Sequence, residues 1–116
     1  MPQASDATDQ FYWNGYRVAV VVFNDSSSDY RHIGQESVGL ADVWDDDHYL
    51  IAQIFDDWNE DTLEVCTVYD LSRHTCYYDL PDGHPIQIVL WRVVNETYRV
   101  TYLGTVEDGN GYLPRA

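Results

Sequence analysis

Residues 16–23 read YRVAVVVF. Four of these eight residues are valine, and the run is apolar on both of the faces that a strand presents, since successive side chains of a strand point to opposite sides. A short run of β-branched, apolar residues is typical of a strand with neighbours on both sides. We therefore predict a central strand of a two-layer protein at this position.

Six further segments show apolar runs or an alternation of apolar and polar residues. The alternation is cleanest in 97–103, where Tyr98, Val100 and Tyr102 share one face. Polar turn residues separate the segments, and a spacing of about 8–12 residues is typical of an antiparallel sandwich or barrel. We predict an all-β domain, a single antiparallel β-sandwich (or barrel) of about seven strands, the further strands being 38–44, 48–55, 62–69, 74–80, 86–94 and 97–104.

One segment also fits a helix. In 47–58, Leu50, Ile54 and Trp58 recur at helical spacing, and Asp47 could cap the start. Asp56 and its acidic neighbours would then lie at the negative end of the helix dipole, which is unfavourable. A strand is favoured, and an α+β fold with one helix near 47–58 is the alternative.

The first ten residues, MPQASDATDQ, are polar and lack the apolar region of a signal peptide. We predict a disordered lead-in over 1–10 and a single β domain over 11–116. The compartment depends on Met1: cytoplasmic if it is the native start, extracellular or at a particle surface if a leader once preceded it. No apolar run approaches the about 20 residues that a membrane helix needs.

Charge separates this chain from most domains of its size. Its 116 residues include 20 acidic and six basic residues, all six of them arginine, for a formal net charge of −14. With 45% hydrophobic and 15% aromatic residues, the chain is too apolar for a disordered acidic tail, so the acids belong on the surface of a folded domain. Direct binding to nucleic acid or to an anionic membrane is disfavoured, because both depend on Lys and Arg. Adaptation to a salt-rich habitat and a surface for recognising partners both explain the acidity.

Cys66 and Cys76 are the two cysteines of the chain. Their even number and short separation favour one disulfide across a hairpin whose turn is 71–73, worth about 2–3 kcal/mol in the loop-entropy model. Two free thiols are the alternative. A metal site is disfavoured, since there is no CxxC pair and no histidine pair at ligand spacing.

Acidic residues gather in the predicted turns. If the strands form a meander, the turns alternate between the two ends of the domain, and the acids form two patches. The first is an interaction patch that comprises Asp56, Asp57, Trp58, Glu60 and Asp61. At its centre is Trp58, an aromatic residue that is hard to bury because the turn around it is acidic. The second comprises Asp45, Asp46 and Asp47. An exposed aromatic ringed by charge is typical of a protein interface.

The residue patterns of enzymes are missing. The four histidines are scattered singly, Ser26 to Ser28 lack a nucleophile elbow, and there is no glycine-rich phosphate loop. With 20 acids, a chance pair of carboxylates carries no signal for glycosidase chemistry. We predict no catalytic residues, no cofactor and no metal, although Asp-rich turns leave calcium open, since it prefers carboxylate oxygens.

Residues 33–69, with the elements GQ…VG and the acidic pair DD between strands, resemble the hairpin pattern of β-sandwich modules in secreted bacterial surface proteins. The resemblance implies an extracellular sandwich and no catalytic residues.

Together these features predict a non-enzymatic interaction or structural module at an extracellular or particle surface. Its partner would be a protein, basic or recognised through the acidic turns. The alternative is a polyanion mimic that blocks a basic nucleic-acid-binding protein. A carbohydrate-binding module, the third hypothesis, would need exposed coplanar aromatic side chains.

Overall fold

The computed structural model describes residues 7–25, 34–44, 48–58, 62–69, 71–80, 83–94, 96–97, 99–107 and 113–115. This part of the chain contains strands and no helix. The strands are β1 (Ala7–Trp13), β2 (Tyr16–Asn24), β3 (Glu36–Asp42), β4 (His48–Asp56), β5 (Thr62–Val68), β6 (Arg73–Tyr78), β7 (Ile86–Val94) and β8 (Val100–Thr105).

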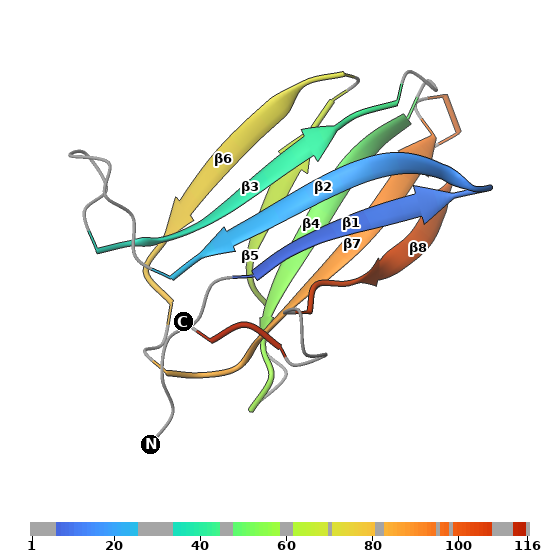
Figure 1. Ribbon diagram of the computed structural model, residues 1–116. Helices are drawn as coiled ribbons and strands as arrows, with labels where there is room; N and C mark the ends of the chain where they lie inside the picture. Colours follow the sequence, from blue (N-terminus) through green and yellow to red (C-terminus); the bar gives the residue numbers. More distant parts are fainter. Residues whose placement is uncertain are drawn as a thin grey trace.

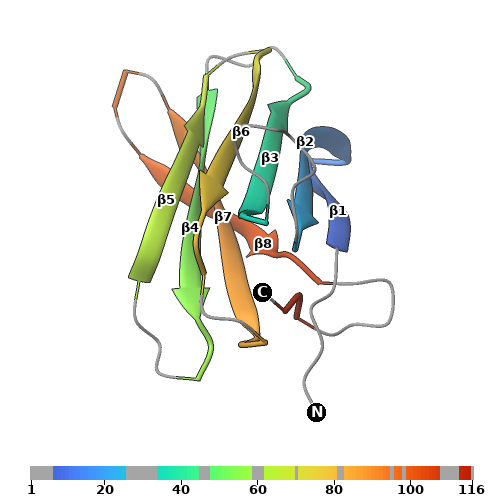
Figure 2. The ribbon, with the colours of Figure 1, turned by 90° about the vertical axis from the view of Figure 1, so that its left-hand side faces the viewer.

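The strands form two antiparallel sheets that pack face to face (Figures 1 and 2). The first sheet has the order β1-β2-β3-β6 and the second the order β5-β4-β7-β8. The prediction of an all-β sandwich is confirmed, and neither sheet closes into a barrel. The helix alternative over 47–58 is wrong, because alternate residues of β4 (Leu50, Ala52, Ile54) are buried, and this period of two is that of a strand.

The first strand was missed by sequence reasoning. Residues 7–10 fall within the lead-in predicted as disordered, yet they belong to β1. Ala7 and Phe11 are buried, whereas Thr8, Gln10 and Tyr12 are exposed along the outer side. An edge strand with one solvated face has few apolar residues, so composition alone does not reveal it.

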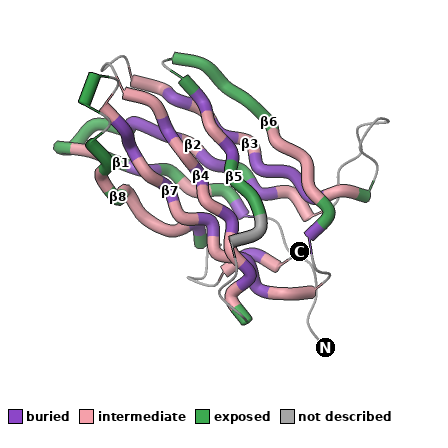
Figure 3. Tube along the Cα trace, turned by 180° about the vertical axis from the view of Figure 1, so that it is seen from behind, coloured by how far each residue is buried: buried purple, intermediate pink, exposed green. Residues whose placement is uncertain are grey.

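The core lies between the sheets and is built from inward-facing side chains of both. Burial of each such side chain contributes roughly 1.5–3 kcal/mol relative to exposure. The largest fully buried side chains of this core are Phe23, Leu40, Leu50, Ile54, Ile86, Ile88, Leu90, Val18, Val21, Val38 and Val106. In the tube coloured by burial, buried residues alternate with residues of intermediate burial along β4 and β7 (Figure 3).

A disulfide joins the two sheets along one side of the sandwich. Cys66 of β5 and Cys76 of β6 are bonded, as the sequence predicted. The predicted hairpin is wrong, however, because β5 pairs with β4 and β6 pairs with β3. The connection over 69–72 therefore crosses from one sheet to the other, and the bond ties together two edge strands that share no ladder.

A close contact between side chain and backbone joins the sheets along the other side. The ring of Phe11 in β1 lies against Gly104 in β8, and a Cβ on Gly104 would stand 2.7 Å from Phe11 Cε1. The φ angle of Gly104, +153°, is also one that L side chains rarely adopt. Glycine is therefore required at this position for the edges to approach.

Tyr78 lies on β6, two residues beyond Cys76, and its hydroxyl donates a hydrogen bond of 3.0 Å to the Val65 carbonyl oxygen of β5. Burial, with the nearby Glu64 carboxylate as a lesser cause, raises the pKa of Tyr78 to about 12 from 10.0. The folded state thus holds this proton more tightly than the unfolded state does, so this contribution to stability is present below pH 10 and is lost as the pH rises toward 12.

We therefore expect Tyr78→Phe to remove the last step of tyrosine ionisation, followed by tyrosinate absorbance. The variant should also flatten the fall in Tm over the same alkaline range. The exposed Tyr12 serves as the matched control, and Tyr12→Phe should leave the late step in place. A late step that survives in Tyr78→Phe would contradict the assignment.

Candidate functional site

The turn after β4 carries the aromatic residue on which the sequence-based interaction patch centres. Trp58 is 57% exposed, in agreement with the expectation. Its backbone N–H donates to Asp56 Oδ1 at 3.0 Å, and its ring lies against the His84 ring at a centroid distance of 4.1 Å. Trp58 is thus exposed on one side and held by β4 and the segment before β7 on the other.

Asp56 differs from the expectation. It is 1% exposed, and its Oδ2 lies 2.7 Å from His84 Nδ1. The carboxylate of Asp56 faces inward at the end of β4 and bonds to His84. It therefore cannot form part of an exposed contact face with Trp58. Asp57 is half-buried, and its backbone N–H donates to the Pro85 carbonyl oxygen. Glu60 and Asp61 lie outside the described residues.

Asp45, Asp46 and Asp47, the second acidic patch, also lie outside the described residues. The neighbouring Trp44 belongs to an aromatic cluster around Arg92 of β7. The Arg92 guanidinium lies 5.1 Å from the Trp13 ring centroid and 5.7 Å from that of Trp44, and Tyr16 stacks on Trp44 at 4.9 Å. Arg92 is buried. Its cation–π contacts with the Trp13 and Trp44 rings stabilise its charge at the edge of the core. The signal in the sequence is a lone arginine in the apolar run 86–94, which sequence reasoning passed over.

The outer face of the second sheet was also missed. Ile51 of β4 pairs in register with Thr67 of β5 and with Trp91 of β7, and Trp91 pairs with Tyr102 of β8. Residues in register point to the same side of a sheet. Because the alternate residues of β4 are buried in the core, this set faces outward.

We call this surface the uncharged face. Its outward positions include Val65, Thr67, Tyr49, Ile51, Gln53, Phe55, Gln87, Val89, Trp91, Val100 and Tyr102. No acidic or basic side chain stands among its described outward positions. In a chain of net charge −14, a sheet face of four strands without charge is unexpected.

Several contacts order the centre of the uncharged face. Trp91 Nε1 donates to Gln53 Oε1 at 2.8 Å, and the Trp91 and Tyr102 rings meet edge to face at 5.6 Å. A hollow of about 370 Å³ lies between side chains of all four strands, lined by Ile51, Gln53, Val65, Trp91 and Val100. Val65, Val100 and Tyr102 are 50%, 54% and 54% exposed. The surface is therefore apolar, partly ordered by side-chain contacts and exposed to solvent.

The acids of the strands explain how this face stays neutral. Asp9, Glu36, Asp42, Asp56 and Glu64 are the carboxylates within the strands. Glu36, Asp42 and Asp56 are buried, and Glu36 Oε2 accepts the backbone N–H of Leu80 at 3.0 Å. Glu64 pairs in register with the buried Ile54, which turns it toward the gap between β5 and β6. The other acids that the structure describes lie outside the strands.

Other kinds of site find little support in the described part of the chain. It contains no cluster of three or more side chains able to hold a metal ion. It also has no helix long and apolar enough to cross a membrane. Tyr16 and Trp44 are nearly parallel at 15°, but the rings cover each other rather than lying side by side as a sugar platform would require.

Comparison of the chain with known protein families, with curated proteins and with solved structures found no significant match. The resemblance of 33–69 to secreted surface modules therefore stays a prediction from strand and turn pattern, and function has to be argued from the surface itself.

Proposed function

We propose that this protein is a non-enzymatic interaction module that binds a protein partner through the uncharged face. The observation that carries the proposal is the exposure of Val65, Val100 and Tyr102 on a four-stranded surface that excludes the charges otherwise abundant in the chain. Exposed apolar patches bounded by polar residues mark interaction sites. The depletion of charge at the centre, with aromatic residues present, is typical of the core of an interface.

The partner should have an apolar centre and a basic periphery. Glu64 and Glu96, both exposed, lie in the edge strand β5 and in the turn between β7 and β8, at the margins of the uncharged face. A chain of net charge −14 attracts a basic surface over a distance of roughly 8 Å at physiological ionic strength. Such attraction raises the association rate and orients the partner, while the apolar centre supplies affinity.

The disulfide supports an extracellular or particle-surface setting. Structural disulfides persist in oxidising compartments and are rare in the cytosol. The Cys66–Cys76 bond joins the two layers of the sandwich, as expected of a small domain that has to stay folded outside the cell.

Two exposed tyrosines on edge strands provide a matched test. Tyr102 of β8 lies on the uncharged face, and Tyr12 of β1 (58% exposed) lies on the opposite sheet. We expect Tyr102→Asp to weaken binding of the partner at least tenfold, because it places a carboxylate on an apolar contact, and hot-spot aromatics contribute about 2 kcal/mol. Tyr12→Asp adds the same charge and should change the affinity less than twofold.

The measurement is affinity capture from the source organism at low and high salt, followed by the Kd of the captured protein for each variant. If both tyrosine variants bind the captured partner with the same Kd, the proposal is overturned. The polyanion-mimic alternative draws its support from the acidic turn beside the exposed Trp58. It predicts that Asp57→Asn, rather than Tyr102→Asp, weakens binding, and that molar salt abolishes it.

A further inference from the structure

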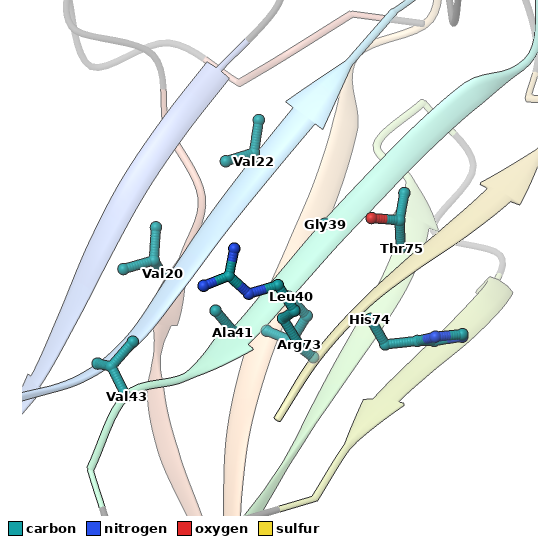
Figure 4. A pocket seen from close by; sticks show the side chains of 9 residues that line it. All are labelled: Val20, Val22, Gly39, Leu40, Ala41, Val43, Arg73, His74 and Thr75. Atoms are coloured by element: carbon teal, nitrogen blue, oxygen red, sulfur yellow. The ribbon is translucent and has the colours of Figure 1, made fainter. Parts of the chain in front are cut away.

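The outer face of the first sheet carries a groove that the proposed function does not use. Its floor is Gly39 and Ala41 of β3, flanked by Val20 and Val22 of β2 on one side and by side chains of β6 on the other (Figure 4). The groove has a volume of about 340 Å³, which is at the lower end of the range for small-molecule sites. The full lining is Val20, Val22, Gly39, Leu40, Ala41, Val43, Arg73, His74 and Thr75.

Val20 and Val22 of the groove belong to the run YRVAVVVF, and no described element covers the second apolar face of this run. Val22 is 43% exposed. It pairs in register with Gly39, which pairs with Thr75 of β6. Where glycine stands between two larger side chains, the sheet surface is hollowed, and apolar area stays in contact with solvent. Covering it would be favourable, because apolar area would be removed from water.

The groove also carries a single positive charge. Arg73 of β6 pairs in register with Ala41, and its guanidinium reaches across β3 toward Val20 and Val22 (Figure 4). None of the hydrogen bonds or ion pairs within the described residues engages this guanidinium. The described outward positions of the first sheet include no carboxylate. An arginine without an acidic partner among the described residues is notable in a chain with 20 acids.

We propose that this groove binds a small apolar molecule that bears one carboxylate, with the carboxylate on Arg73 and the apolar body over Gly39. A guanidinium pairs with a carboxylate through two parallel hydrogen bonds. The described lining offers apolar contact and contains no carboxylate that would compete for Arg73. The net charge of −14 repels a ligand with several negative charges, which restricts the occupant to a monocarboxylate.

Gly39 allows the apolar half of the site to be tested without disturbing the sheet. A Cβ at this position would meet Thr75 Oγ1 and the Val22 carbonyl oxygen at 3.7 Å, and Val22 Cβ at 3.8 Å, all ordinary contacts. Gly39→Ala should therefore fold normally and make the groove shallower. Gly39→Val fills it further with a residue that strands favour.

The test uses decanoate as the probe and decanol as its uncharged counterpart, with binding followed by NMR titration of the backbone amides of the disulfide-bonded protein. We expect shifts confined to β2, β3 and β6, and decanoate to bind about threefold to fivefold more tightly than decanol, as an exposed ion pair allows. Arg73→Gln should lower decanoate affinity to that of decanol and leave decanol unchanged. Gly39→Val should abolish binding of both, and Gly39→Ala should weaken both.

Arg99→Gln is the matched control, since Arg99 is exposed and precedes β8 in the other sheet. It changes the net charge equally and should leave both affinities unchanged. The proposal is overturned if decanoate does not bind or binds no better than decanol. It is also overturned if Arg73→Gln acts no more strongly than Arg99→Gln, or if the shifts fall on β4 and β7.

Discussion

Removal of the Cys66–Cys76 disulfide should lower the free energy of unfolding by about 2–4 kcal/mol, among the largest effects of any change to this chain. The bond closes a short loop, since its cysteines are separated by 10 positions. In the loop-entropy model the cross-link restricts the unfolded chain, and its loss restores that freedom. In the folded state it joins β5 to β6, which share no ladder, so the edges of the two layers lose their covalent connection.

The measurement is urea denaturation of the oxidised protein, of the reduced protein and of the double variant Cys66→Ala/Cys76→Ala. Mass spectrometry confirms the redox state, because reduction adds two hydrogens. The free energies of unfolding of the reduced protein and of the double variant should agree within about 1 kcal/mol. Although Cys66 is buried, its replacement by alanine removes only the sulfur atom. An unchanged midpoint after complete reduction would show that core packing alone holds the sheets together.

His84→Ala should destabilise the fold by about 3 kcal/mol, because it leaves a buried carboxylate without its main partner. Asp56 Oδ2 bonds His84 Nδ1 at 2.7 Å, and the carboxylate side chain is 2% exposed. After the substitution, the backbone N–H of Trp58 remains as a donor to Asp56 Oδ1. The Trp58 ring also loses the His84 ring against which it lies, so the turn after β4 should become less ordered.

A double-mutant cycle separates the energy of the Asp56–His84 contact from that of the packing between the Trp58 and His84 rings. Asp56→Asn removes the charge but keeps an acceptor for Trp58, so the double variant Asp56→Asn/His84→Ala should be more stable than His84→Ala alone. His74→Ala, at an exposed position of β6, is the control and should change stability by less than about 0.5 kcal/mol. If His84→Ala behaves like His74→Ala, the Asp56–His84 contact contributes nothing to the fold.

Much of the local structure could be predicted from the sequence. The strand over 86–94 has the predicted bounds, and 16–23 is an interior strand of its sheet. The disulfide was predicted from the number and spacing of the cysteines, and the exposure of Trp58 from the polarity of its neighbours. These features depend on residue type and on a period of two, both of which are local properties of the chain.

Other features depend on which strands become neighbours. The spacing of Cys66 and Cys76 fits a hairpin as well as a crossing between sheets, and the crossing occurs because β6 pairs with β3 rather than β5. Asp56 looked like one more acid of an exposed turn. It is buried because β4 ends with its inward side chain directed toward His84, which lies 28 residues later in the chain.

The sequence by itself therefore determined the class of fold, the approximate strands, the covalent bond and an acidic surface, because hydrophobic period and composition act over a few residues. Only the tertiary structure decided where charge is missing. Ile51, Trp91 and Tyr102 form one uncharged face because three strands pair in register, and Arg73 reaches Val20 because β6 lies beside β3. Pairing between distant segments is set by the packing of the whole core, and no short stretch of sequence records it.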